Sequence, residues 1–456
     1  MAEADNRSCI ILLMDRYGEE SKQLCYSLKR AGILYKGVVI DDDGFLEADI
    51  ESPYGFFLGD YKNAKGSPGR PRYFNRVEVP KFWEISANNR SGKISDLSKE
   101  RGRIFYAEPL NKRLVNAVDW LDEKGVVRST DHYNRYGMLF SRTAFNKKGE
   151  RVNRSYFSPD EKEILTENYV TGDITLNYRD RIYFFRNKTE LICFYLKEAG
   201  YENCDIYYNS LSYPFFVSER MEGEHKDNIL FWQEPVGNEI PGNMRMILNA
   251  PDGRTKRIMV QKRTSYEKLL RLGAKKDMLC LLGYIYPFTG KNLHGNNVLI
   301  CTNSDNIACL GELVEGLPGL HFHIAALTEM SSRLMAYEDN ENVTLYPGID
   351  MIRLEGLFRK CDIYFDINHE AEIVSAIKRA FLANMLIFAF KETLHNAEFV
   401  IPSHIFTKNA PKEFITCVKD MISTEKKIDE EIEKQHEFAL SEAPGSYLMI
   451  KSRNNS

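Results

Sequence analysis

Residues 361–390 read CDIYFDINHEAEIVSAIKRAFLANMLIFAF, the pattern of one strand–loop–helix–strand unit of a parallel sheet. The apolar run 361–365 predicts a strand that is buried on both faces. After a polar loop, apolar residues recur at helical spacing from Glu372 onward, and a second apolar strand is predicted over 386–390. Ligands of such sheets bind where the loops leave the carboxyl ends of the strands. Residues 366–375 are therefore expected to decide the function.

The chain on both sides of this unit alternates strands with helices. Strands are predicted over 9–14, 35–40, 205–208, 229–232, 257–261, 297–301, 321–324 and 343–346. Helices are predicted over 19–31, 190–199, 265–272, 306–314, 331–335, 352–359, 412–421 and 425–440. Alternation of this kind is typical of doubly wound parallel sheets. We expect an α/β protein of the GT-B type, with two Rossmann-like domains that face a cleft.

A segment of different texture interrupts the first of these domains. Aromatic-rich segments with alternating polarity, separated by turns at 146–149 and 179–180, predict an inserted antiparallel β-sheet. The expected boundaries are 1–60 and 189–272 for the first Rossmann-like domain, 61–188 for the insertion, 273–424 for the second Rossmann-like domain and 425–456 for a C-terminal helical segment.

Exposed aromatic side chains often mark a surface that binds another protein, so the insertion is expected to bind a partner. Its expected anchors are Trp83, Trp120, Tyr133 and Tyr136. The alternative is a sheet that packs on a helix of its own, predicted over 111–122. Both interpretations fit the sequence.

The charge balance argues against nucleic acid as a partner. The 456 residues carry 61 Lys and Arg against 65 Asp and Glu, a formal net charge of −4. No apolar stretch approaches the length of a membrane span, and the run 9–14 is too short for a signal peptide. The expected location is the cytoplasm, with at most a peripheral association with the membrane.

No metal site or cofactor is predicted. The nine cysteines are scattered without metal-ligand spacing, which favours free thiols in a reducing compartment. Asp41, Asp42 and Asp43 precede a glycine and are expected to form a turn. His321 and His323 share one side of a strand but lack a third ligand, so we expect histidines satisfied by hydrogen bonds.

Several longer segments resemble the accessory-Sec glycosylation chaperones of the GtfB family. They include IDDDGFLEADIESPYGFF (40–57), PRYFNRVEVPKFWEI (71–85), VDWLDEKGVVRSTDHYNRYGMLF (118–140), ENYVTGDITL (167–176), YNSLSYPF (208–215), LFWQEP (230–235), PGNM (241–244), TNSD (302–305), FHIAALTEMS (322–331) and CDIYFDINHEAEI (361–373). The resemblance implies a GT-B fold with a β-sheet add-on domain. It also implies a complex, expected to be a heterotetramer, with a catalytic GtfA subunit that transfers GlcNAc to Ser and Thr of serine-rich repeat adhesins.

The residues expected of an active transferase are missing from the decisive stretch. Retaining enzymes of this fold commonly carry two glutamates here, and the matching positions are Ile367 and Ser375. Active relatives also place an Arg and a Lys after the first strand of the second domain to bind the diphosphate, whereas no basic residue lies between Cys301 and Leu320. Binding of a nucleotide-sugar donor is not expected.

The strand ends carry neutral polar groups that suit a Ser/Thr-rich peptide and sugar hydroxyls. The candidate acceptor-binding residues are Asn209, Ser210, Ser212, Trp232, Gln233, Glu234, Asn303, His323, Thr328, Glu329, Asn368, His369 and Glu372. For any one of them, capping of a helix or loop is an alternative role.

The sequence therefore predicts a non-catalytic subunit that binds the adhesin and stabilises its partner transferase. One alternative is an active retaining transferase that uses Glu370 or Glu372, with Lys262 or Arg263 binding the diphosphate. The other alternative is a scaffold without acceptor contact.

Overall fold

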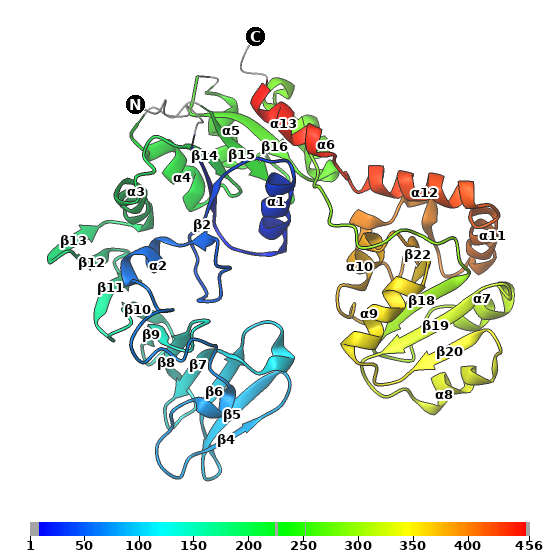
Figure 1. The fold of residues 1–456 in the computed structure, drawn as a ribbon, viewed down its shortest axis with the longest axis horizontal. Helices are drawn as coiled ribbons and strands as arrows, with labels where there is room; N and C mark the ends of the chain where they lie inside the picture. The colour runs from blue at the N-terminus through cyan, green and yellow to red at the C-terminus, as the bar shows by residue number, and fades with distance from the viewer. Residues whose placement is uncertain (1–8, 224–226, 251, 453–456) are drawn as a thin grey trace. The chain divides into compact units, whose positions relative to one another are not determined.

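The computed structural model describes residues 9–223, 227–250 and 252–452. The chain forms two compact units, Met1–Leu281 and Leu282–Ser456 (Figure 1). The first unit contains a parallel sheet and a larger antiparallel sheet, and the second unit contains one parallel sheet.

The parallel sheet of the first unit has seven strands in the order β17-β16-β15-β14-β1-β2-β3. Its strands are β1 (Ile10–Met14), β2 (Lys36–Val39), β3 (Ile50–Glu51), β14 (Asp205–Tyr208), β15 (Asn228–Trp232), β16 (Thr255–Val260) and β17 (Leu279–Leu281). Its helices are α1 (Glu19–Arg30), α2 (Pro53–Leu58), α3 (Lys188–Glu198), α4 (Tyr213–Arg220), α5 (Gly242–Leu248) and α6 (Arg263–Arg271). Every residue of β1 is buried, because helices cover both faces. Ile11 and Leu13 join the core that includes residues of α3 and α4, whereas Met14 contacts Cys25 of α1.

The insertion is a ten-stranded antiparallel sheet with the strands in sequence order, from β13 at one edge to β4 at the other. The strands are β4 (Glu84–Ala87), β5 (Ser91–Asp96), β6 (Lys99–Tyr106), β7 (Val115–Leu121), β8 (Val127–Tyr133), β9 (Leu139–Phe145), β10 (Arg151–Phe157), β11 (Glu163–Asn168), β12 (Ile174–Tyr178) and β13 (Arg181–Phe185). Both predicted turns are present. Arg179 and Asp180 have positive φ angles, as the tight turn between β12 and β13 requires.

The helix predicted over 111–122 is wrong, because β7 occupies most of this segment. Val115, Val118 and Leu121 are buried at a spacing of three residues, which imitates a helix. The spacing arises because the pairing register shifts between Phe105 and Tyr106 on β6 and again between Trp120 and Leu121. Such bulges change the alternation of side chains along a strand.

The sheet of the second unit has six parallel strands in the order β20-β19-β18-β21-β22-β23. Its strands are β18 (Asn297–Thr302), β19 (His321–Ala326), β20 (Val343–Tyr346), β21 (Ile363–Asp366), β22 (Leu386–Phe390) and β23 (Ile405–Phe406). Its helices are α7 (Leu310–Gly316), α8 (Ser332–Met335), α9 (Met351–Lys360), α10 (Ala376–Leu382), α11 (Pro411–Met421), α12 (Glu425–Phe438) and α13 (Pro444–Ser452). One core includes residues of α7, α11 and α12, and a second core includes residues of α9 and α10 (Figure 1).

The decisive stretch forms the predicted unit, but its helix begins late. Val374 and Ser375 have positive φ angles, so α10 begins at Ala376 rather than near Glu372. Similarly, α7 begins at Leu310 rather than at Asn306. Helices α2, α4, α5 and α13 have no counterpart among the sequence-based expectations. The polar loops at the carboxyl ends of the strands are therefore longer than expected.

The expectation that all cysteines are free is also wrong, because Cys9 and Cys204 form a disulfide. They immediately precede β1 and β14, which pair in parallel with Ile10 opposite Asp205. This register brings the two Cα atoms to 4.6 Å. The other seven cysteines carry free thiols. Within the described ranges, no helix is both long and apolar enough to span a membrane.

Candidate functional site

Both parallel sheets share a strand order that creates a topological switch point. In the first unit, β1 lies between β2 on one side and β14 on the other. In the second unit, β18 lies between β19 and β21 in the same way. The switch point lies between β1 and β14 in the first unit and between β18 and β21 in the second. Ligands of open α/β sheets bind at the carboxyl ends of the strands beside such a point.

Asn209 closes the switch point of the first unit. Its Nδ2 donates hydrogen bonds to Ser21 Oγ and Gln233 Oε1, both at 3.0 Å, and its Oδ1 accepts one from the Asp15 main chain at 3.3 Å. Gln233 in turn donates to Gln261 Oε1 at 2.9 Å. The predicted residues Asn209 and Gln233 therefore meet in one buried network that joins the ends of β1, β14, β15 and β16.

The other predicted residues of the first unit differ in exposure. Ser210 is buried and its Oγ accepts a hydrogen bond from the main chain of the exposed Ser212 at 3.1 Å. Trp232 is buried in the core, so its side chain is not available to an acceptor. The Glu234 side chain reaches solvent. Partial desolvation of its carboxylate and the negative charges of Asp15 and Glu20 raise its pKa. The charges beside this switch point are mixed, because the exposed Arg16 pairs with Asp41 and Lys262 pairs with Glu20.

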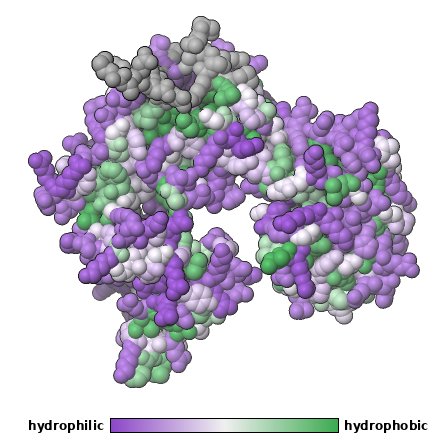
Figure 2. Space-filling model, viewed as in Figure 1, coloured by the Kyte–Doolittle hydropathy of each residue, from purple (hydrophilic) through white to green (hydrophobic). Residues whose placement is uncertain are grey.

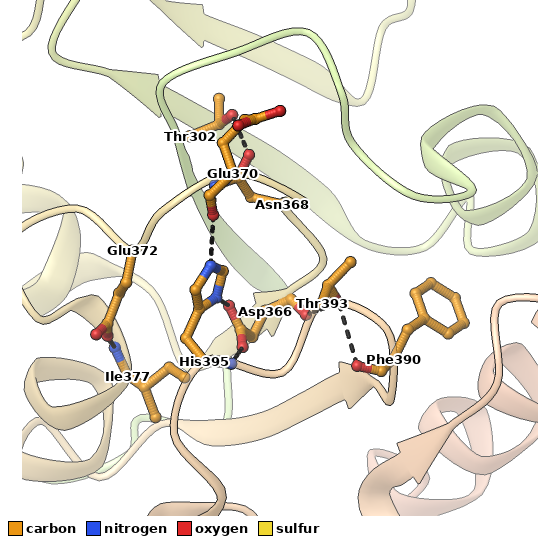
Figure 3. A network of polar contacts seen from close by, with 9 residues as sticks. All are labelled: Thr302, Asp366, Asn368, Glu370, Glu372, Ile377, Phe390, Thr393 and His395. Atoms are coloured by element: carbon orange, nitrogen blue, oxygen red, sulfur yellow. Dashed lines mark hydrogen bonds and ion pairs between the residues drawn. The ribbon is translucent and has the colours of Figure 1, made fainter.

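The switch point of the second unit is bridged by both side chains and main chain (Figure 3). Thr302 Oγ1 donates to Asn368 Oδ1 at 2.9 Å, and Asn368 Nδ2 donates to the Glu370 carbonyl oxygen at 3.0 Å. The main-chain nitrogens of Ala308 and His369 donate to the carbonyl oxygens of Ile367 and Asn306, at 2.8 and 3.0 Å. The loop that follows β18 is therefore attached along its length to the loop that follows β21.

This network extends to Asp366, the first residue of the stretch expected to decide the function, and to His395, which the sequence-based reasoning missed. Asp366, at the end of β21, accepts hydrogen bonds from the main-chain nitrogen of His395 at 2.8 Å and pairs with its Nδ1 at 2.6 Å (Figure 3). His395 Nε2 lies 2.5 Å from the Glu370 carbonyl oxygen. The hydrogen bond with Asp366 raises the pKa of His395 to about 9. The available signal was a histidine shortly after the last buried strand, which is too common to single out.

Of the remaining predicted residues of the second unit, Asn303, Thr328 and Glu329 follow the neighbouring parallel strands β18 and β19, whereas His323 lies within β19. Asn303, Thr328 and Glu329 are exposed at the ends of β18 and β19. Glu372 caps α10, since its Oε1 accepts a hydrogen bond from the Ile377 main chain at 2.9 Å. His323 is buried away from the carboxyl ends, where it contacts Tyr346 Oη at 2.9 Å and Asn297 Oδ1 at 3.0 Å.

The two positions that would carry glutamates in an active enzyme cannot replace them. Ile367 is fully buried in the core, and Ser375 is exposed with a left-handed backbone conformation. Among the described residues, no group of three or more His, Cys, Asp or Glu side chains could hold a metal ion. The arrangement offers amide, hydroxyl and carbonyl groups, which recognise hydrogen-bonding ligands.

Three of the four predicted partner anchors belong to a small core of the insertion. Trp83, Trp120 and Tyr133 pack with Ile94, Ile104 and Val118. Trp120 Nε1 donates to Asp131 Oδ2 at 2.9 Å, and the Arg72 guanidinium lies 4.8 Å from the centre of the Tyr133 ring. The fourth anchor, Tyr136, packs against the core of the first parallel sheet.

Other hydrophobic side chains of the insertion are exposed instead. Ile182 and Phe184 lie on the same side of the edge strand β13, with exposed fractions of 63% and 75%. On the face of the protein drawn in Figure 2, hydrophobic residues form small patches separated by hydrophilic residues. The edge strand thus combines unpaired main-chain groups with two apolar side chains.

Two doubly wound parallel sheets, one of them interrupted by an antiparallel sheet, define a GT-B-like protein with an add-on domain. Profiles of the GtfB N-terminal, middle and third domains match residues 11–57, 83–186 and 188–272, and the GftB/GlyA-F C-terminal domain matches 298–435. The chain is 44% identical to the UDP-N-acetylglucosamine–peptide N-acetylglucosaminyltransferase stabilizing protein GtfB of Streptococcus agalactiae, over 97% of this chain and 98% of that protein. It is 39% identical to the protein of the same name from Streptococcus gordonii, over 91% and 92% of the two chains. The chain belongs to the GtfB family.

Solved structures agree with this assignment. A chain in the crystal structure of a GtfA/B complex bound to UDP and GlcNAc matches with a TM-score of 0.90 and 37% identity, covering 98% of this chain and all of that one. The pneumococcal O-GlcNAc transferase GtfA matches with a TM-score of 0.56 at 10% identity, covering 99% of this chain and 100% of that chain, a likeness of fold alone.

Proposed function

We propose that this chain is the non-catalytic subunit of a protein O-glycosyltransferase complex, which stabilises a GtfA-like GlcNAc transferase and binds its serine-rich acceptor polypeptide. The similarity to proteins named as stabilising a peptide N-acetylglucosaminyltransferase supports the stabilising role. The bridged switch point of the second unit is the observation that carries the non-catalytic role.

A nucleotide-sugar would have to bind at the switch point of the second unit, where hydrogen bonds join the loops that follow β18 and β21. The 303–309 loop is joined to the 367–369 loop by the main-chain bonds of Ala308 and His369, and Thr302 and Asn368 add a side-chain bond. Opening this space would leave several buried polar groups without partners, at about 1–3 kcal/mol each. The segment 301–320 also supplies no cation to balance a diphosphate.

Two of the groups that an active enzyme could use, Glu372 and Lys262, are already engaged elsewhere. Glu372 caps α10, and the main chain of Glu370 accepts from Asn368 and His395. Lys262 Nζ forms an ion pair with Glu20 Oε1 at 2.7 Å. The contacts of Glu372 and Lys262 disfavour a catalytic role for Glu372 with Lys262 binding the diphosphate.

The acceptor polypeptide would bind through the exposed and half-buried polar residues of the strand-end loops. Within the second unit, Asn303, Thr328 and His369 offer side chains that can form hydrogen bonds with a peptide rich in Ser and Thr, and Ser212 does so within the first unit. Buried Asn209, Gln233 and Asn368 would act indirectly, because they fix the loops that carry these residues.

The insertion would bind the partner through its exposed apolar side chains. Ile182 and Phe184 are suited to this role because burial of large apolar groups provides most of the energy of such interfaces. Trp83, Trp120 and Tyr133 would support the sheet from within.

The test is calorimetric titration of the full chain, without its partner, against UDP-GlcNAc and separately against an unmodified Ser/Thr-rich peptide. Binding of the peptide without binding of the nucleotide would support the proposal. Binding of UDP-GlcNAc would show that the switch point opens and would favour the enzyme. If neither ligand binds while the GtfA-like partner binds tightly, the chain is a scaffold.

A further inference from the structure

The geometry around His395 fixes where its protons lie. Nε2 is 2.5 Å from the Glu370 carbonyl oxygen, which can only accept a hydrogen bond, so Nε2 must carry a proton. Nδ1 is 2.6 Å from a carboxylate oxygen of Asp366, a buried side chain that also accepts from the His395 main chain. The arrangement is that of an imidazolium between a carboxylate and a carbonyl group.

We propose that His395 is a positioning residue of the acceptor site, whose charged ring holds the 367–372 loop in the form that binds the acceptor. This inference rests on the proposed acceptor-binding function. The loop carries Asn368, His369 and Glu372, and the Glu370 carbonyl group accepts from both His395 and Asn368. A change at His395 therefore reaches the loop directly, although His395 itself need not touch the acceptor.

A role as general base does not fit the same geometry. Both ring nitrogens already face oxygen atoms of the chain, so neither has a lone pair available to remove a proton from a substrate. Asp366 is engaged as well, and its main-chain carbonyl oxygen accepts from Thr393 Oγ1 at 2.7 Å. The network holds the ends of β21 and β22 together and supplies no reactive group.

The surroundings of the ring keep it charged at neutral pH. The charged groups that act on it are the carboxylates of Asp366 on β21 and Glu372 before α10. The hydrogen bond with Asp366 outweighs the effect of burial and raises the pKa of His395 to about 9. Acceptor affinity is therefore expected to be constant near neutral pH and to fall as the ring loses its proton near pH 9.

The experiment measures the affinity of the full chain for an unmodified Ser/Thr-rich peptide between pH 7 and pH 10. The variants are His395→Asn and the control His321→Asn, since His321 also makes one side-chain hydrogen bond in the same sheet, to Thr344 Oγ1 at 2.7 Å. Titration of histidine side chains by NMR reports the protonation of His395 independently of binding, and thermal unfolding verifies that the variants are folded.

The wild type and His321→Asn are expected to bind equally at pH 7 and to weaken together near pH 9. His395→Asn is expected to bind about tenfold more weakly at pH 7, the effect of losing one charged hydrogen bond, and to lack the decline near pH 9. Equal affinity of His395→Asn and wild type at pH 7, or the same decline with pH in both, would overturn the inference while leaving acceptor binding intact. Absence of peptide binding by the wild type would overturn the proposed function, and this inference with it.

Discussion

Asn368 accepts a hydrogen bond from Thr302 across the switch point of the second parallel sheet, at 2.9 Å. Asn209 occupies the corresponding place in the first sheet, where it accepts a hydrogen bond from the main chain of Asp15 at 3.3 Å. In both units an asparagine after the strand that continues the sheet is bonded to the carboxyl end of the first strand, at Thr302 in β18 and at Asp15 directly after β1. An asparagine thus bridges the switch point of each parallel sheet.

Thr302→Val should destabilise the second unit by about 1–3 kcal/mol, because it leaves Asn368 Oδ1 and the Ser304 main-chain nitrogen without their partner in a buried place. Valine keeps the shape of threonine, so packing is preserved. Denaturant unfolding measures the loss. The matched control is Thr416→Val on α11, whose Oγ1 bonds to the Lys412 carbonyl oxygen at an exposed position, and which should change stability by less than about 0.5 kcal/mol. Equal losses in the two variants would contradict this account of the switch point.

His395 should make the stability of the chain depend on pH in a particular direction. Its pKa rises from the ordinary 6.5 to about 9 on folding, so its stabilising effect is complete below pH 6.5 and disappears as pH rises through 9. The difference in unfolding free energy between wild type and His395→Asn should therefore be largest near pH 6 and small at pH 9.5. Denaturant unfolding at both pH values measures it. A difference that grows with pH would mean that the histidine is neutral in the folded chain.

Reduction of the disulfide between Cys9 and Cys204 should lower thermal stability, because the bond closes a loop of 195 residues that includes the whole insertion. An effect of about 2–4 kcal/mol is expected for such a bond. Peptide mapping without reductant should recover Cys9 joined to Cys204. Cys204→Ala should unfold earlier than wild type and be insensitive to reductant, whereas the control Cys280→Ala should respond to reductant as the wild type does. Recovery of nine free thiols would refute the bond.

The order of strands and helices could be predicted from the sequence because buried parallel strands are continuous apolar runs, as β21 and β22 are. The β-sheet insertion was predictable from its alternation and turns. Errors arose where local conformation departs from regular periods. The bulges of β7 imitated a helix, and the positive φ angles of Val374 and Ser375 shortened α10.

Contacts between distant segments could not be predicted in this way. The disulfide depends on the pairing of β1 with β14, and the pair of Asp366 with His395 depends on the chain returning to β21 after β22. Asn209, Gln233 and Asn368 were recognised as polar residues at strand ends, but their burial was not, because it depends on how neighbouring loops fold over them. The alternation of the insertion predicts Trp120 as a possible partner anchor but does not reveal that its ring packs against the core of the insertion.

Phe184→Glu should weaken binding of a GtfA-like partner by more than roughly tenfold, because it replaces an exposed apolar side chain at the edge of the inserted sheet with a charged one. The control is Ile352→Glu in the second unit, where an exposed apolar residue on α9 should tolerate the same change.

Trp120→Phe separates the structural role from the anchoring role. It removes the hydrogen bond to Asp131 but leaves Arg142 Nη2 bonded to the same carboxylate at 3.0 Å, so stability should fall by about 1 kcal/mol while partner affinity stays unchanged. Partner affinity is measured by surface plasmon resonance with the immobilised partner, and stability by denaturant unfolding. Loss of binding in Trp120→Phe with full binding in Phe184→Glu would reverse the assignment and make Trp120 the anchor.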